Sequence, residues 1–270
     1  MSMNFSREQM LLRQRLQAEG SPTRAEKLQQ EIGGDLTFLG ADEPAIRAAA
    51  NDLVATYPQM GRAQMTAFVR TLWQSRIHEL RAVGVELLAA RAELLEPHDL
   101  DFLEKLLKDG EADALAAKLA ADVLGTLVVK NKKLWRDLRR FATASNEALQ
   151  RAAVRACRLP LLHDEAAFAR FEELTTPLFA TADATLQRAI DELLAAAAAV
   201  HADAVRDLAE RHGRKVALPK PRAKAAAKAA AAKPAEAKPA AAKPATAKPA
   251  PASRAVAPRK KAAKKAPKKA

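Results

Sequence analysis

Apolar residues recur every three or four positions through most of residues 1–213, which is the spacing of one face of an α-helix. The clearest case is the segment after Asn146, where Leu149, Ala152 and Ala156 form one apolar stripe. Asn146 is suited to cap this helix, because its side chain can accept hydrogen bonds from the free N–H groups of a first turn. The pattern therefore predicts an α-helix over residues 146–158.

The same periodicity, together with capping residues and breaks, predicts a chain of helices. Ser6 to Gln9 has the form of a capping box, Pro22 and Pro44 suit the start of a helix, and Gly33 suits its end. The predicted helices are 6–19, 21–33, 44–57, 61–73, 77–91, 99–108, 113–129, 132–143, 146–158, 165–175, 183–200 and 202–212. Predicted breaks are at Pro97, Gly110, Pro160 and Pro177.

A basic residue stands near the start of five of these Ala/Leu-rich helices, at regular intervals. The positions are Arg47, Arg81, Lys118, Arg151 and Arg188, separated by 34, 37, 33 and 37 residues. This is the period of a repeated two-helix unit. Because β-branched and aromatic residues are few and strong helix formers are many, we predict an all-α fold, a HEAT-like α-solenoid of antiparallel helix pairs.

The charge divides the chain into two parts. The chain has 45 basic and 32 acidic residues. Residues 214–270 contain 18 of the basic residues and one acidic residue, so residues 1–213 contain 27 basic and 31 acidic residues. The C-terminal part repeats Lys-Pro-Ala every five residues from Lys233, and its prolines prevent a continuous helix. We therefore predict a helical domain over 1–213 and a disordered basic tail over 214–270.

Several classes of function lack support. A single cysteine, Cys157, excludes an internal disulfide and, on an apolar stripe, is predicted to be a small buried residue. His78-Glu79 is not followed by a second histidine, since Ala82 occupies that position, so no metal site is predicted. No phosphate-binding loop or cofactor motif is present, and no segment is apolar enough to span a membrane. We expect no cofactor and a cytoplasmic, nucleoid-associated monomer.

Four segments, taken in order, resemble the AlkD-type DNA alkylation-repair glycosylases. They are Phe38–Arg47, Leu72–Arg81, Leu124–Gly125 and Ser145–Arg151. The resemblance covers roughly residues 35–200. It implies a HEAT-like solenoid whose concave face grips duplex DNA, and the excision of N3- and N7-alkylated purines without flipping them into a pocket.

The catalytic residues of that family are matched only in part. The resemblance places its catalytic arginine at Arg151 and its catalytic aspartate at Ala117, which carries no charge to stabilise a cationic sugar. The family's tryptophan positions fall at Asp113, Phe141, Ala148 and near Glu192. Asp113 lies one helical turn before Ala117 and is a candidate for a relocated acid. The candidate catalytic residues are therefore Arg151 and Asp113, and the resemblance leaves open whether the chain is an enzyme.

Two sets of basic residues are candidates for DNA binding. In the body, Arg47, Arg81, Lys118, Arg151 and Arg188 either contact successive phosphates or form an internal ladder with acids of the next repeat. The tail resembles those of linker histones and bacterial histone-like proteins, whose lysines bind phosphates without base specificity. Its candidates are Lys233, Lys238, Lys243, Lys248, Arg259, Lys260, Lys261, Lys264, Lys265, Lys268 and Lys269.

Three hypotheses follow. The first is a DNA-binding protein of the alkylation-repair family that cradles duplex DNA, alkylated or intact, with weak or no base excision and a non-specific tail. The second is an active alkylpurine glycosylase with a relocated acid. The third is a non-catalytic helical scaffold for protein partners, held on the nucleoid by its tail.

Overall fold

The computed structural model describes residues 3–109 and 113–214. The chain divides into two units, Met1–Pro221 and Arg222–Ala270, and all described residues belong to the first. Within them the regular structure is helical, with no strand and one isolated bridge between Thr37 and Ile77. The all-α class predicted from the sequence is confirmed.

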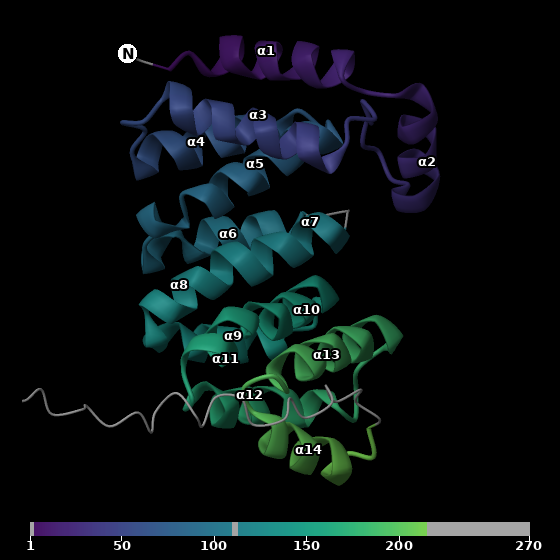
Figure 1. Ribbon diagram of the computed structural model, residues 1–270, viewed down its shortest axis with the longest axis vertical. Coiled ribbons are helices and arrows are strands. Elements are labelled where there is room, and N and C mark those ends of the chain that lie inside the picture. Colours follow the sequence, from purple (N-terminus) through teal and green to yellow (C-terminus); the bar gives the residue numbers. More distant parts are fainter. Residues whose placement is uncertain (1–2, 110–112, 215–270) are drawn as a thin grey trace, which may run out of the picture. The chain divides into compact units, whose positions relative to one another are not determined.

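The described helices follow each other closely along the chain (Figure 1). The α-helices are α1 (Phe5–Ala18), α2 (Pro22–Ile32), α3 (Glu43–Thr56), α4 (Arg62–Gln74), α5 (His78–Ala90), α6 (Leu100–Lys108), α7 (Asp113–Lys118), α8 (Gly125–Lys130), α9 (Trp135–Ala142), α10 (Glu147–Ala156), α11 (Arg158–His163), α12 (Ala167–Thr175), α13 (Ala184–Ala197) and α14 (Ala202–Arg211). A π-helical segment, η3 (Leu119–Leu124), joins α7 to α8.

These helices stack as successive pairs. One row runs from α3 to α5, then to the α7–η3–α8 helix, then to α10 and α13, each packed on the one before. The partner helices α4, α6 and α9 pack against α5, η3 and α10 respectively, and α12 packs on α9 (Figure 1). The first row carries all five basic positions of the repeat, so the period read from the sequence corresponds to one helix pair.

The core between the two rows is built from Leu, Ala and a few large rings. Phe68, Phe141 and Phe171 are fully buried, and Trp73 and Trp135 are nearly so, as packing residues. Full burial of such a side chain contributes about 1.5–3 kcal/mol. The many alanines let neighbouring helices approach closely, which brings the surface residues of adjacent repeats within reach of one another.

Three local features differ from the prediction. The N-cap of α1 is Asn4, whose Oδ1 accepts from the Arg7 N–H at 3.1 Å, and not Ser6. Pro160 does not separate two helices but lies in the first turn of α11. Proline is tolerated there because the N–H groups of a first turn have no partner within the helix. The helix predicted over 113–129 is continuous but changes to π geometry at Leu119–Leu124.

Gly125 fixes how closely two successive layers of the stack meet. A Cβ at this position would lie 3.1 Å from the Ala156 carbonyl oxygen and 3.6 Å from the Leu159 Cβ. The absence of a side chain therefore lets the end of α10 and the start of α11 lie directly on the η3–α8 junction. This contact sets the position of the arginines of α10 and α11 relative to η3.

Glu79 fixes the loop before α3. Its carboxylate is fully buried and accepts from the backbone N–H groups of Leu39, at 3.0 Å, and of Gly40, at 2.7 Å. Gly40 has a φ of +76°, a conformation that favours glycine. This Glu79 of the His-Glu-Leu-Arg segment thus has a structural role.

Arg214, the last residue that the structure describes, is held against the helical body. Its Nε donates to Asp191 Oδ1 at 2.7 Å, and its guanidinium lies 5.3 Å from the centre of the Phe179 ring. The remaining predicted tail, including every tail residue proposed to bind DNA, lies outside the described residues.

Candidate functional site

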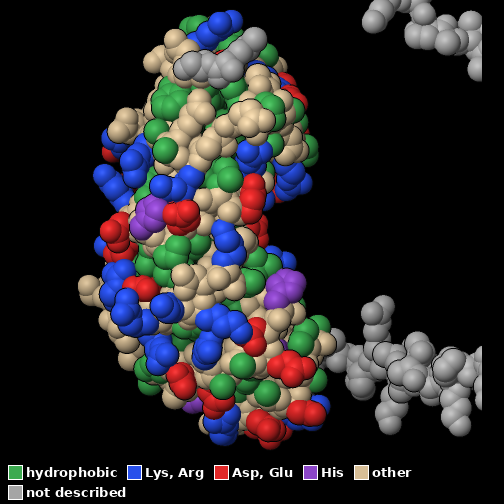
Figure 2. All heavy atoms as spheres, turned by 90° about the vertical axis from the view of Figure 1, so that its left-hand side faces the viewer, with side chains coloured by type: hydrophobic (Ala, Val, Ile, Leu, Met, Phe, Trp, Pro, Cys, Tyr) green, Lys and Arg blue, Asp and Glu red, His purple; other side chains and the backbone are tan. Residues whose placement is uncertain are grey.

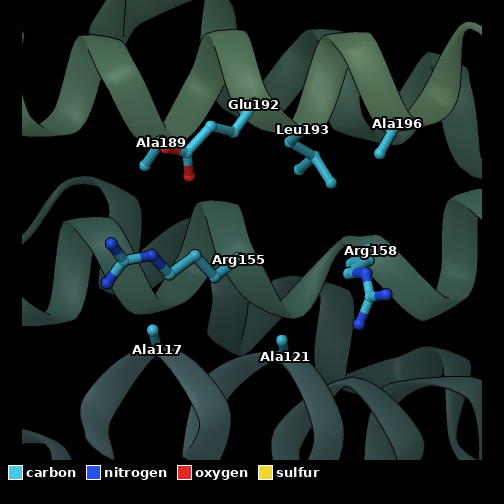
Figure 3. Close-up of a pocket in the computed structure, with 8 residues that line it drawn as sticks. All are labelled: Ala117, Ala121, Arg155, Arg158, Ala189, Glu192, Leu193 and Ala196. Carbon is cyan, nitrogen blue, oxygen red and sulfur yellow. The ribbon is translucent and has the colours of Figure 1, made fainter. Parts of the chain in front are cut away.

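A pocket of about 240 Å³ opens between three helices of the first row (Figure 3). Its walls come from α7 and η3 on one side, from α10 and α11 in the middle, and from α13 on the other side. The lining residues are Ala117, Ala121, Arg155, Arg158, Ala189, Glu192, Leu193 and Ala196. Small apolar side chains thus form most of the surface, and two guanidinium groups and one carboxylate supply the polar groups.

The arginines of the pocket continue the stripe that starts at Arg151. Arg151, Arg155 and Arg158 follow at intervals of four and three residues, so they lie along one side of the α10–α11 segment. In Figure 3, Arg155 and Arg158 lie between the helices above and below, with their guanidinium groups at opposite ends of the pocket. Arg158 is half exposed and pairs with Asp122 at 3.5 Å. Neither Arg155 nor Arg158 was predicted from the sequence, although their spacing from Arg151 indicated that they share its helix face.

The floor of the pocket lies at the transition to π-helix. Ala117 belongs to the end of α7 and Ala121 to η3, and both methyl groups point toward α10 and α11 (Figure 3). Single π-helical turns inside α-helices are frequent at functional sites. Here no charge is present at position 117, where the resemblance places the catalytic aspartate.

The wall from α13 carries two charged residues that form no ion pair with the described part of the chain. Arg188 and Glu192, one turn apart, are exposed, and neither forms an ion pair with another described residue. Glu192 points from α13 into the space above Arg155 and Ala117 (Figure 3). By contrast, the neighbouring Asp191 is paired with Arg214 at 2.7 Å.

Arg47 and Lys118 form part of an internal ladder. The Oε1 atom of Glu86, on α5, forms an ion pair with Lys118 Nζ at 2.9 Å and a longer one with Arg47 Nε at 3.9 Å. Arg47 also pairs with Glu43, and Lys118 with Asp122 at 3.9 Å. One carboxylate thus connects three successive helices of the row, as the ladder interpretation describes, while about half of the Arg47 side chain stays exposed.

Arg81 lies inside the fold. Only 7% of its surface is exposed, its Nε donates to the Trp73 carbonyl at 3.0 Å, and its guanidinium lies 5.1 Å from the centre of the Trp73 ring. A further contact reaches the Asp109 carbonyl at 3.5 Å. Arg81 therefore does not belong to the surface that faces the pocket.

The two proposed catalytic residues come from two different helices of this site. Arg151 lies on α10 with 19% of its side chain exposed, 3.5 Å from Glu147. Asp113 begins α7, but its side chain lies outside what the structure describes. Both helices border the pocket, which places the two candidate residues in its neighbourhood.

Buried titratable groups elsewhere are structural. Burial lowers the pKa of His78, against the opposing effect of Glu79, and the ring lies 5.2 Å from the centre of the Phe38 ring. Burial raises the pKa of the Cys157 thiol, which is fully enclosed, as predicted for a small core residue. Across residues 3–109 and 113–214, no three His, Cys, Asp or Glu side chains come together as a metal site.

Basic side chains also gather on the side of the body shown in Figure 2. Several cations around α8 and α9 are held by the fold. Lys132 pairs with Asp164 at 2.6 Å, Arg140 with Glu104 at 2.8 Å, and Lys130 donates to the Glu93 carbonyl at 2.7 Å. Lys132 and Arg140 are therefore partly neutralised, whereas Lys130 is held by hydrogen bonds to neutral carbonyls. In the described part of the chain, no helix has the length and apolar character needed to cross a bilayer.

Comparison with known proteins gives a consistent result. The sequence model of the family described as "DNA alkylation repair enzyme" matches residues 12–229. Among solved structures, the chain is similar to a protein described as "Predicted DNA alkylation repair enzyme from Enterococcus faecalis", with a TM-score of 0.61 and 16% identity over 77% of this chain and 98% of the other. At this identity the likeness concerns the fold. No curated protein matches the chain.

Proposed function

Because the chain belongs to the DNA alkylation repair enzyme family, we propose that it binds duplex DNA, alkylated or intact, on the face formed by α3, α7, α10 and α13. The observation that carries this proposal is the pocket on that face, where arginines border a surface of small side chains. A surface of this kind lets a polyanionic backbone approach closely and gives its phosphates guanidinium donors.

The proposed phosphate contacts are those cations whose charge is least satisfied by the fold. Arg188 forms no ion pair with another described residue, and Arg158 shares only the half-exposed Asp122. Arg47, Lys118 and Arg151 border the same face but are held by carboxylates of neighbouring turns, so we assign them a secondary part.

The proposal includes weak or absent base excision. A positive charge develops on the sugar when the bond to a purine breaks, and a carboxylate stabilises that charge. Ala117 supplies none. The tail is proposed to add non-specific affinity, because its dispersed lysines displace counterions from any duplex, and to raise the effective concentration of the body near DNA.

The test compares two double variants of the full chain that remove the same charge. Arg158→Ala with Arg188→Ala alters the proposed face, whereas Arg206→Ala with Arg211→Ala alters α14, where Arg206 pairs with Asp203 and Arg211 pairs with Glu172 of α12. Affinity for a duplex with one 7-methylguanine, and for the unmodified duplex, is measured between 50 and 200 mM salt.

We expect the slope of log K against log salt to fall by about one per removed phosphate contact for the first pair, and to stay unchanged for the second. Equal slopes for the two double variants would contradict the proposed face. If the full chain binds neither duplex, the helical-scaffold hypothesis replaces the DNA-binding one.

A further inference from the structure

We propose that Glu192 is the carboxylate of this site and supplies, from α13, the negative charge that position 117 lacks. The inference rests on the proposed function. It concerns the excision that remains, which is expected to be weak, and it assigns a catalytic residue in addition to those predicted from the sequence.

The first support is the direction of the side chain. Glu192 belongs to the same pocket as Ala117, on the opposite wall, and extends from α13 toward α10 in the close-up (Figure 3). Its carboxylate and the Arg155 guanidinium lean toward the same end of the pocket, above the Ala117 methyl group. Alanine on the far wall leaves the space between them open to a ligand.

The second support is that competing carboxylates are occupied. Asp122, next to the floor, pairs with Lys118 and Arg158, and the Asp191 carboxylate pairs with Arg214. Glu192 forms no ion pair within residues 3–109 and 113–214. An exposed carboxylate that lies at the Arg155 end of the pocket and forms no ion pair with another described residue keeps its charge for an incoming cation.

The third support is the arrangement of opposite charges around the pocket. Arg155 and Arg158 lie at opposite ends and can hold the phosphates on either side of one nucleotide, because DNA recognition relies on such backbone contacts for register. The sugar between those phosphates then lies over the small side chains of the floor. Glu192 faces that space from the other wall.

The chemistry follows from an alkylated purine that already carries a positive charge. When the bond from sugar C1′ to the purine nitrogen breaks, its electron pair leaves with the base, which departs neutral, and C1′ becomes cationic. Glu192 stabilises this cation. Water then adds to C1′, the carboxylate accepts the released proton, and an abasic site remains.

The experiment uses the full chain and a duplex with one 7-methylguanine, under single-turnover conditions, with spontaneous depurination subtracted. Glu192→Gln removes the charge at nearly the same size, and Asp191→Asn is the matched control on the adjacent residue of the same helix. A third variant, Ala117→Asp with Glu192→Gln, places a carboxylate on the opposite wall. Duplex affinity is measured for every variant.

We expect release by the unaltered chain above the spontaneous rate, a loss of about 10²-fold or more in that excess for Glu192→Gln, and little change for Asp191→Asn. The variant with Asp at 117 should regain release. Affinity should not fall in Glu192→Gln, since a negative charge has been removed from a DNA-binding face, and Glu192 is exposed enough to be replaced without loss of fold.

Release by Glu192→Gln equal to that of the unaltered chain would overturn the inference. So would an unaltered chain that binds the duplex without any release above the spontaneous rate, although the proposed DNA-binding function would then stand. A chain that does not bind the duplex refutes the proposed function itself. The affinity measurement separates these two failures.

Discussion

Arg81 provides the sharpest test of whether the basic residues of the repeat serve DNA or the fold. Its position in the repeat predicts a phosphate contact, but the structure buries it against Trp73. Replacing Arg81 by Met keeps most of the volume and removes the charge and all donors. The Trp73 carbonyl then loses a hydrogen bond of 3.0 Å from a charged group.

The cost follows from these contacts. A hydrogen bond from a charged group contributes about 1.5–3 kcal/mol, and a desolvated cation–π contact contributes up to about 2 kcal/mol. We expect Arg81→Met to lower the free energy of unfolding by about 3 kcal/mol, which corresponds to a melting temperature lower by about 6–12 °C for a domain of this size. Thermal and denaturant unfolding followed by circular dichroism measure both quantities.

The DNA measurement gives the complementary result. At a temperature well below melting, Arg81→Met should leave the salt slope of duplex binding unchanged, whereas Arg188→Ala should reduce the slope by about one without affecting melting. If Arg81→Met instead melts at the same temperature as the unaltered chain, and its salt slope of duplex binding falls by one, the burial argument is refuted. The phosphate contact predicted from the repeat would then be correct.

Further predictions concern the loop before α3, a buried histidine and the tail. Glu79→Gln leaves one of the Leu39 and Gly40 N–H groups facing an amide donor, so stability in urea should fall by about 1–3 kcal/mol; a loss no larger than that of a surface substitution would refute this role. Burial lowers the pKa of His78 from 6.5, so the unfolded state binds more protons as the pH falls below 6.5 and stability decreases there. His78→Phe should weaken that decrease in pH-dependent denaturation, and an unchanged profile would contradict it. Truncation after Pro221 removes 15 basic residues and one acid, so the salt slope of duplex binding should become shallower by several units; an unchanged slope would show that the tail does not engage DNA.

The helices could be predicted because burial on one face imposes a period that the sequence displays. The differences between the predicted and the observed helices have local causes that the hydrophobic period does not reveal. Asn4 rather than Ser6 caps α1, because either side chain can accept from a first turn and only the position of the helix decides. Pro160 belongs to a helix because it falls in a first turn, where its missing N–H costs nothing.

The candidate site was only partly predictable, for a reason that Arg81 and Arg47 illustrate. Both occupy equivalent positions of the repeat, but α5 is buried along nearly its whole length whereas α3 exposes one side. A basic residue on α5 is therefore drawn inward, while Arg47 keeps contact with solvent. Burial of a whole helix depends on the neighbouring helices, and no single window of sequence reveals it.

Arg155 and Glu192 show the opposite case, in which the signal was present but unused. Arg155 follows Arg151 by four residues, and Glu192 follows Arg188 by four, so each pair shares a helix face. That Arg155 and Glu192 line one pocket depends on the contact of α10 with α13 and on the close approach at Gly125. These distances between helices are set by tertiary packing.

The Glu86 carboxylate, shared by Lys118 and Arg47, has a consequence for energetics. If duplex DNA binds this face as proposed, the carboxylate occupies the place of a phosphate beforehand and keeps two long side chains extended, so that less conformational entropy would remain to be lost on binding. Because the two cations are already neutralised, few small ions would condense around them, and few would be released if a DNA strand replaced the carboxylate. On such a surface, the number of positive residues overstates how strongly DNA affinity would depend on ionic strength. The main event of binding would be the replacement of the Glu86 carboxylate by a phosphate.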